Sequence, residues 1–115
     1  MNYTQSDINS IIAEARQEAA KAANQFFQEK LGGQDQYACG FAWVDISKVK
    51  GNTKLGKMFK AAGVEQSYSR HKAFSIWNPS GHNCQNVDTK EAGAYAAAQV
   101  FKKYGFEAYA GSRLD

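Results

Sequence analysis

The chain has few of the residues that stabilise small secreted or metal-bound domains. Its 115 residues include two cysteines, two histidines and one proline. No C-x-x-C motif or Cys/His cluster supplies four metal ligands, which argues against a zinc site. Two isolated cysteines are typical of free thiols rather than of a disulfide framework. We therefore expect neither a metal nor another cofactor.

Long apolar runs are also missing. No stretch approaches the roughly 18 apolar residues that a membrane-spanning helix needs. The N-terminus lacks the basic region and apolar core of a secretory signal. The sequence therefore predicts a cytoplasmic protein that makes no membrane contact.

Catalytic and phosphate-loop signatures are absent as well. The chain has neither G-x-x-x-x-G-K-[ST] nor G-x-G-x-x-G. Cys39 falls in a predicted central strand, where cysteine usually acts as a small buried hydrophobe. Cys84 and His82 are two residues apart in a predicted loop, a spacing that rarely presents a nucleophile to its base. The sequence favours a binding protein over an enzyme, and a Cys/His-dependent phosphodiesterase is its weakest reading.

Three segments show the apolar spacing of helices. The first starts at a capping box formed by Thr4 and Asp7 and runs for about 25 residues, until Gly32 and Gly33 end it. A short helix is expected over 53–62. The third, expected over 88–104, is rich in alanine and glycine and should pack closely against its neighbours.

Strands are expected over 37–46, 72–77 and 106–112. Both faces of 37–46 are apolar, which predicts a central strand covered on both sides. The elements then follow an α-β-α-β-α-β order. The sequence predicts one compact α+β domain over 1–115, with a three-stranded, mainly antiparallel sheet, helices packed on it and a long N-terminal helix.

Positive charge gathers in the middle of the chain. Residues 48–72 contain six lysines and one arginine against a single glutamate. The lysines of this basic surface are Lys48, Lys50, Lys54, Lys57, Lys60 and Lys72. Such a surface suits phosphate backbones, and nearby aromatic rings can stack bases. A solvated lysine face over a short helix is the simpler reading.

Residues with ligand-binding chemistry lie in and around the last two predicted strands. The candidate residues are Arg70, Trp77, Ser80, His82, Asn83, Tyr109 and Arg113. Arg113 and Tyr109 share one strand face by their even spacing, and with Trp77 and Arg70 they are expected to form a guanidinium-and-ring site for a nucleotide-type ligand. The structural alternatives place both rings in the core and pair Arg113 with Asp115 or Asp45.

Four segments carry a family resemblance: 39–44 (CGFAWV), 76–81 (IWNPSG), 90–94 (KEAGA) and 108–115 (AYAGSRLD). Together they resemble a group of small proteins encoded by tailed bacteriophages. The resemblance covers about residues 37–115 and is most specific at the C-terminal motif. It implies a phage accessory protein that acts in the host cytoplasm, where such proteins often bind and block a host component. It implies no enzymatic activity.

The sequence leads to one function and three alternatives. We expect a non-enzymatic protein that counteracts host defence by sequestering a phosphate-bearing, nucleotide-type ligand. The alternatives are a protein inhibitor of a host enzyme, a nucleic-acid-binding protein and the phosphodiesterase. A homo-oligomer, most simply a dimer, is expected through Phe26, Phe27 or the surface of 92–98, because the long and the thin helix offer more apolar surface than a small sheet covers.

Overall fold

The computed structural model describes residues 2–67 and 72–115. Its elements are α1 (Gln5–Leu31), β1 (Gly40–Ser47), α2 (Lys54–Ala61), β2 (Glu65–Gln66), β3 (Ala73–Trp77), α3 (Val87–Lys103) and β4 (Glu107–Leu114). The described strands form one antiparallel sheet in the order β2-β3-β1-β4. The α+β class, the long first helix and the central place of β1 are confirmed. The expected strand number is wrong, because the two-residue β2 is too short to leave a period-two pattern.

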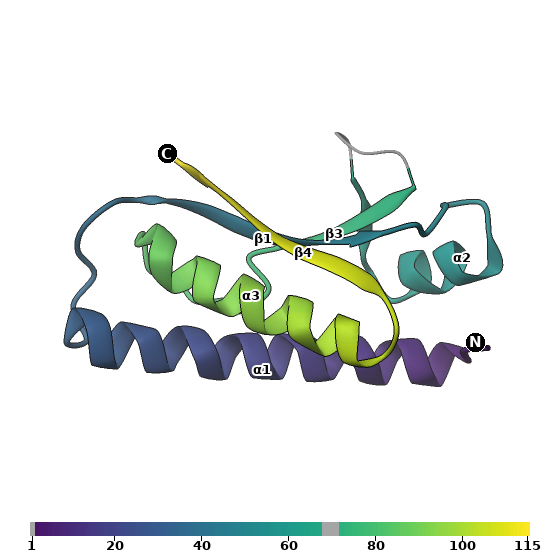
Figure 1. Cartoon of the computed structure of the whole chain (residues 1–115), viewed down its shortest axis with the longest axis horizontal. Helices are drawn as coiled ribbons and strands as arrows, with labels where there is room; N and C mark the ends of the chain where they lie inside the picture. The colour runs from purple at the N-terminus through teal and green to yellow at the C-terminus, as the bar shows by residue number, and fades with distance from the viewer. Residues whose placement is uncertain (1, 68–71) are drawn as a thin grey trace.

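The two long helices lie on the same side of the sheet (Figure 1). α3 packs against β1 and β4, α1 packs along α3, and α2 lies beyond one end of α3. Burial therefore alternates along β1: Ala42, Val44 and Ile46 are fully buried, whereas the residues between them are partly exposed. The expectation that β1 is covered on both faces is wrong. The aromatic residues of β1 have the apolar pattern of a buried face, but their side chains lie on the face of the sheet that no helix covers.

The core joins the helices to the inner face of the sheet. Ile8, Ala15 and Ala19 of α1 are buried, as are Phe74 of β3 and Phe101 of α3. The predicted capping box is present, since Thr4 and Asp7 bond each other's backbone amides. These contacts fix the helical layer against which the sheet is held.

β4 runs antiparallel to β1 along the full length of β1. The register pairs Ser47 with Glu107 at one end and Gly40 with Leu114 at the other. Beyond the strand, the Asp115 amide donates to the Cys39 carbonyl at 3.1 Å. The C-terminal residues are therefore part of the sheet and face the first strand of the chain.

The surfaces expected to carry a dimer contact are only partly covered inside the chain, and Tyr95 of α3 is 61% exposed. Gly93, Ala94 and Ala97 are buried in the fold, and Phe27 packs on the His82 ring with a centroid distance of 4.8 Å. Phe26 is half-buried. Self-association thus stays a prediction. Among residues 2–67 and 72–115, no helix combines the length and hydropathy needed to cross a bilayer.

Candidate ligand-binding site

The open face of the sheet carries the candidate site. Side chains there alternate with the buried ones and come from three adjacent strands. They are Phe41, Trp43 and Asp45 of β1, Ser75 and Trp77 of β3, and Tyr109, Gly111 and Arg113 of β4. Trp77 is 55% exposed and Tyr109 is 48% exposed, so neither ring is a core residue.

Two tryptophans form the centre of this face. Trp43 and Trp77 are directly opposite each other in the β1–β3 register. Their rings stack with centroids 5.5 Å apart and an interplanar angle of 2°. Phe41 lies 5.4 Å from Trp77 at an angle of 35°. Such aromatic pairs stabilise a sheet by about 0.5–1.5 kcal/mol beyond the burial of their area. The three rings form a partly exposed aromatic surface, called the platform below.

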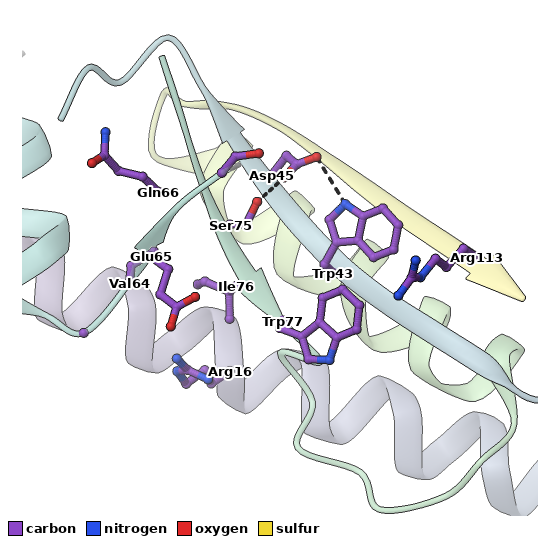
Figure 2. A pocket seen from close by; sticks show the side chains of 12 residues that line it. Arg16, Trp43, Asp45, Val64, Glu65, Gln66, Ser75, Ile76, Trp77 and Arg113 are labelled. Carbon is purple, nitrogen blue, oxygen red and sulfur yellow. Dashed lines mark hydrogen bonds between the residues drawn. The ribbon is translucent and has the colours of Figure 1, made fainter. Parts of the chain in front are cut away.

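A carboxylate fixes the orientation of the Trp43 ring. The indole Nε1–H donates to Asp45 Oδ2 at 3.2 Å. Asp45 Oδ1 accepts a hydrogen bond from the Ser75 hydroxyl, as Figure 2 shows. Because Asp45 is held from β3 and bonds the indole in turn, the platform is pre-organised rather than loosely packed.

Arg113 lies over the edge of the platform. It is opposite Phe41 in the β1–β4 register, and its guanidinium carbon is 5.3 Å from the Phe41 centroid and 6.0 Å from that of Trp77. Within the described residues no ion pair joins it to a carboxylate, including Asp45 and Asp115. Its hydrogen-bond donors are thus available to an anion beside the rings.

These residues line a hollow of about 740 Å³, called the aromatic hollow below. Its walls include Trp43, Asp45, Ser75, Trp77, Arg113, Arg16 of α1 and Glu65 of β2. Figure 2 shows Arg113 at one end and Arg16 below β3, near Glu65. Among the described residues, the hollow therefore combines aromatic rings with the guanidiniums of Arg16 and Arg113 and the carboxylates of Asp45 and Glu65.

The structure brings together only part of the predicted ligand-binding set. Trp77 and Arg113 meet in the aromatic hollow. Tyr109 shares their face but is opposite Asp45, four residues from Arg113 along β4, and does not line the hollow. Arg70 lies outside the described residues.

The polar loop residues serve the loop itself. The Ser80 hydroxyl donates to Asn78 Oδ1 at 3.2 Å and accepts from the His82 amide at 3.1 Å. His82 Nδ1 accepts from the Cys84 amide at 3.3 Å, and its ring packs on Phe27. Asn83 is exposed. Neither these residues nor Asn83 line the aromatic hollow, so their role in ligand binding stays a prediction.

The basic surface is present and exposed. Lys48, at the opposite end of β1 from Phe41, forms an ion pair with Glu107 at 2.8 Å. Lys54, Lys57 and Lys60 project from α2 to solvent. Lys50 lies between β1 and α2, Lys72 directly precedes β3, and both are exposed. None of the six lines the aromatic hollow.

The two thiols differ in exposure, and the expected burial of Cys39 in a central strand is wrong. Cys39 precedes β1 and is exposed, whereas Cys84 is buried in its loop. The strand was expected to start at residue 37, but Tyr37 has a φ of 68°, which an extended strand does not adopt. Burial raises the pKa of the Cys84 thiol, and the charge of Asp35 acts in the same direction. A protonated buried thiol is a poor nucleophile. The described residues contain no group of three or more His, Cys, Asp or Glu able to hold a metal ion.

Sequence reasoning missed half of the platform. Phe41 and Trp43 were assigned to a covered strand, and Asp45 only to a possible ion pair. The sequence signal for the site was the two-residue spacing of Gly111 and Arg113. This spacing puts a position without a side chain and a cation on the same face of the strand. Arg16 carries no local signal, because only the packing of α1 beside the sheet brings it to the hollow.

Comparison of the chain with protein-family models, curated proteins and solved structures gave no match.

Proposed function

We propose that this protein binds a nucleotide-type ligand on the open face of its sheet and does not transform it. The observation that carries this proposal is the stacked Trp43–Trp77 pair with Arg113 at its edge. An aromatic platform accepts the flat face of any base, and each base–ring stack contributes about 1–3 kcal/mol. A guanidinium beside it suits a phosphate, which it binds through two parallel hydrogen bonds.

The charges of the aromatic hollow favour a short ligand over a long strand. Arg16 and Arg113 are accompanied by Asp45 and Glu65. Long single strands are bound in grooves whose positive charge follows the phosphate backbone. The described residues of this hollow have balanced charge, which instead suits a ligand with one or two bases and few phosphates.

Binding without turnover is part of the proposal. Asp45 is occupied by Trp43 and Ser75 and serves to orient them. The thiol of Cys84, beside His82, is buried, and Cys39 does not line the hollow. General acid–base catalysis needs a group within hydrogen-bond reach of the reacting atom, and among the described residues the hollow offers only the carboxylates of Asp45 and Glu65.

We also propose the biological setting that the phage resemblance implies. Three of the four resembling segments supply the site: 39–44 gives Phe41 and Trp43, 76–81 gives Trp77, and 108–115 gives Arg113. A protein that sequesters a nucleotide signal in the host cytoplasm would counteract a defence that depends on that signal. This setting follows from the resemblance and not from the geometry.

A panel of linear and cyclic nucleotides and single-stranded DNA, titrated at two salt concentrations, tests the proposal. We expect a nucleotide to bind with a shallow salt dependence and to be recovered unchanged by chromatography. Affinity for DNA that falls steeply with salt would instead indicate a nucleic-acid-binding protein, because each neutralised phosphate releases counterions. A new product would indicate an enzyme.

A protein partner is the second candidate. Tryptophan and arginine are enriched among the hot-spot residues that contribute most of the binding energy of a protein interface. Trp77 and Arg113 are both exposed. The absence of binding to any nucleotide or DNA in the panel would favour this candidate.

A further inference from the structure

A second hollow is lined by three lysines and by Gln66 of β2. The hollow has a volume of about 530 Å³ and is lined by Lys50, Gly51, Asn52, Lys60, Gln66 and Lys72. We call it the lysine hollow. Gln66 lines both hollows, and Figure 2 shows its side chain at the far end of the aromatic hollow from Arg113. Half of the basic surface therefore converges on one place, whereas Lys48, Lys54 and Lys57 do not line it.

The backbone holds the three lysines in fixed relative positions. The Val49 amide donates to the Lys72 carbonyl at 3.0 Å, which fixes Lys72 beside Lys50. The Thr53 hydroxyl and amide both donate to the Lys50 carbonyl, at 2.6 and 3.2 Å, and close a turn at the start of α2. The fold thus fixes the backbone positions of Lys50 and Lys72 next to each other.

Two glycines allow this close packing. A Cβ at Gly56 of α2 would lie 2.1 Å from the Lys50 carbonyl oxygen, so the turn rests directly on the helix that carries Lys60. A Cβ at Gly51 would lie 2.2 Å from the Gln66 side-chain nitrogen. Because Gly51 has no side chain, the Gln66 amide can pack against its backbone in the lysine hollow.

No described residue that lines the lysine hollow carries a negative charge. Among the described residues, its charged lining residues are lysines, and the two remaining polar side chains are the amides of Asn52 and Gln66. Within the described residues, none of Lys50, Lys60 and Lys72 forms an ion pair. Like charges gathered in this way repel each other, and a bound anion relieves that repulsion. Lysines act on phosphate as mobile point charges, with the amides as additional donors.

We propose that the lysine hollow is an anion-binding site that takes a phosphate or diphosphate group. The site does not depend on the nucleotide proposal, because it needs no aromatic ring. Together the two proposals describe one continuous binding surface. Gln66 lies between the aromatic hollow, which would bind the base, and the lysine hollow, which would bind the phosphate.

Inorganic pyrophosphate is the probe, because it has no base to stack. Isothermal titration would compare wild type with Lys60→Gln/Lys72→Gln and with the charge-matched control Lys54→Gln/Lys57→Gln. We expect the first pair to weaken binding by about tenfold or more, the loss of at least one charge-assisted contact. We expect the control to bind nearly as wild type. Trp77→Ala should leave pyrophosphate affinity unchanged, even if it removes nucleotide binding.

Amide chemical shifts on adding pyrophosphate to wild type give a test that needs no variant. Shifts centred on Gly51, Asn52 and Gln66 would support the site. No binding of pyrophosphate, or an equal loss of affinity in the two double variants, would overturn it and leave an ordinary solvated lysine face. Nucleotide binding that fails while pyrophosphate still binds would reject the proposed function alone.

Discussion

Gly111 leaves open the space that the indole of Trp43 fills. The two residues are opposite each other in the β1–β4 register, and a Cβ at Gly111 would lie 2.5 Å from Trp43 Nε1. The ring can therefore lie across β4, parallel to Trp77 and within reach of Asp45. The flat platform depends on this missing side chain.

Gly111→Ala is expected to displace the indole of Trp43. The added methyl meets ring atoms at less than 3 Å, so the ring must turn away from Trp77 and lose its bond to Asp45. We expect a stability loss of about 1–3 kcal/mol, typical of overpacking. Near-ultraviolet circular dichroism would report the lost Trp43–Trp77 stacking. Ser112→Ala is the control in the same strand, and an unchanged spectrum in Gly111→Ala would contradict the role of this glycine.

Arg113→Lys is expected to weaken ligand binding without destabilising the fold. The side chain is exposed and forms no ion pair within the described residues, so the melting temperature should barely change. Lysine cannot form the two parallel hydrogen bonds of a bidentate arginine–phosphate contact, so the binding free energy should weaken by about 1.5–3 kcal/mol. Arg16→Lys tests the second guanidinium in the same way. A lower melting temperature with unaltered affinity would show that Arg113 has a structural role only.

The α1–α3 contact predicts an acid-dependent part of the stability. Hydrogen bonds from Lys103 and then Tyr104 lower the pKa of the Glu14 carboxyl. Because the folded pKa is below the unfolded one, this stabilisation is complete above the unfolded pKa and is lost as pH falls through the folded pKa. Glu14→Gln should therefore lower the melting temperature near pH 7, by an amount that shrinks on acidification. Glu18→Gln, on the same helix, should show a smaller difference, and a constant difference in Glu14→Gln would contradict the linkage.

The thiols are expected to react at very different rates. Cys39 is exposed, whereas Cys84 is buried and the pKa of its thiol is raised. Ellman's reagent should therefore modify one thiol in the native protein and two after denaturation. Cys39→Ala should remove the fast phase, and Cys39→Ala with Cys84→Ser should leave ligand binding intact. Rapid reaction of Cys84 in the native protein would show that its loop opens readily.

The fold was largely readable from the sequence because its helices have strong periodic and capping signals. Thr4 and Asp7 mark the start of α1, and apolar spacing marks the rest. β2 was missed, since Glu65 and Gln66 are both exposed and carry no apolar alternation. The covering of β1 was misread because Phe41 and Trp43 are apolar on an open face, and their exposure depends on which side the helices pack.

The site was predictable only where residues are close in sequence or share a strand face. Arg113 and its spacing pointed to the C-terminal strand, and Trp77 was included with it. Their meeting with Trp43 depends on the strand order β3-β1-β4, which no local pattern specifies. The packing of the His82 ring on Phe27 was not predictable either, because it joins segments far apart in the chain.

Calorimetric titration of wild type and Trp77→Ala with each common mononucleotide tests the central claim most directly. Trp77 is exposed, so its removal should leave the fold intact, and Tyr95→Ala removes an equally exposed ring from α3 as the control. We predict that wild type and Tyr95→Ala bind a nucleotide alike and that Trp77→Ala loses about 1–3 kcal/mol of affinity, the contribution of one base–ring stack. Equal affinity in all three proteins, or no nucleotide binding by wild type, would contradict the proposal that the open face of the sheet is a nucleotide-binding site.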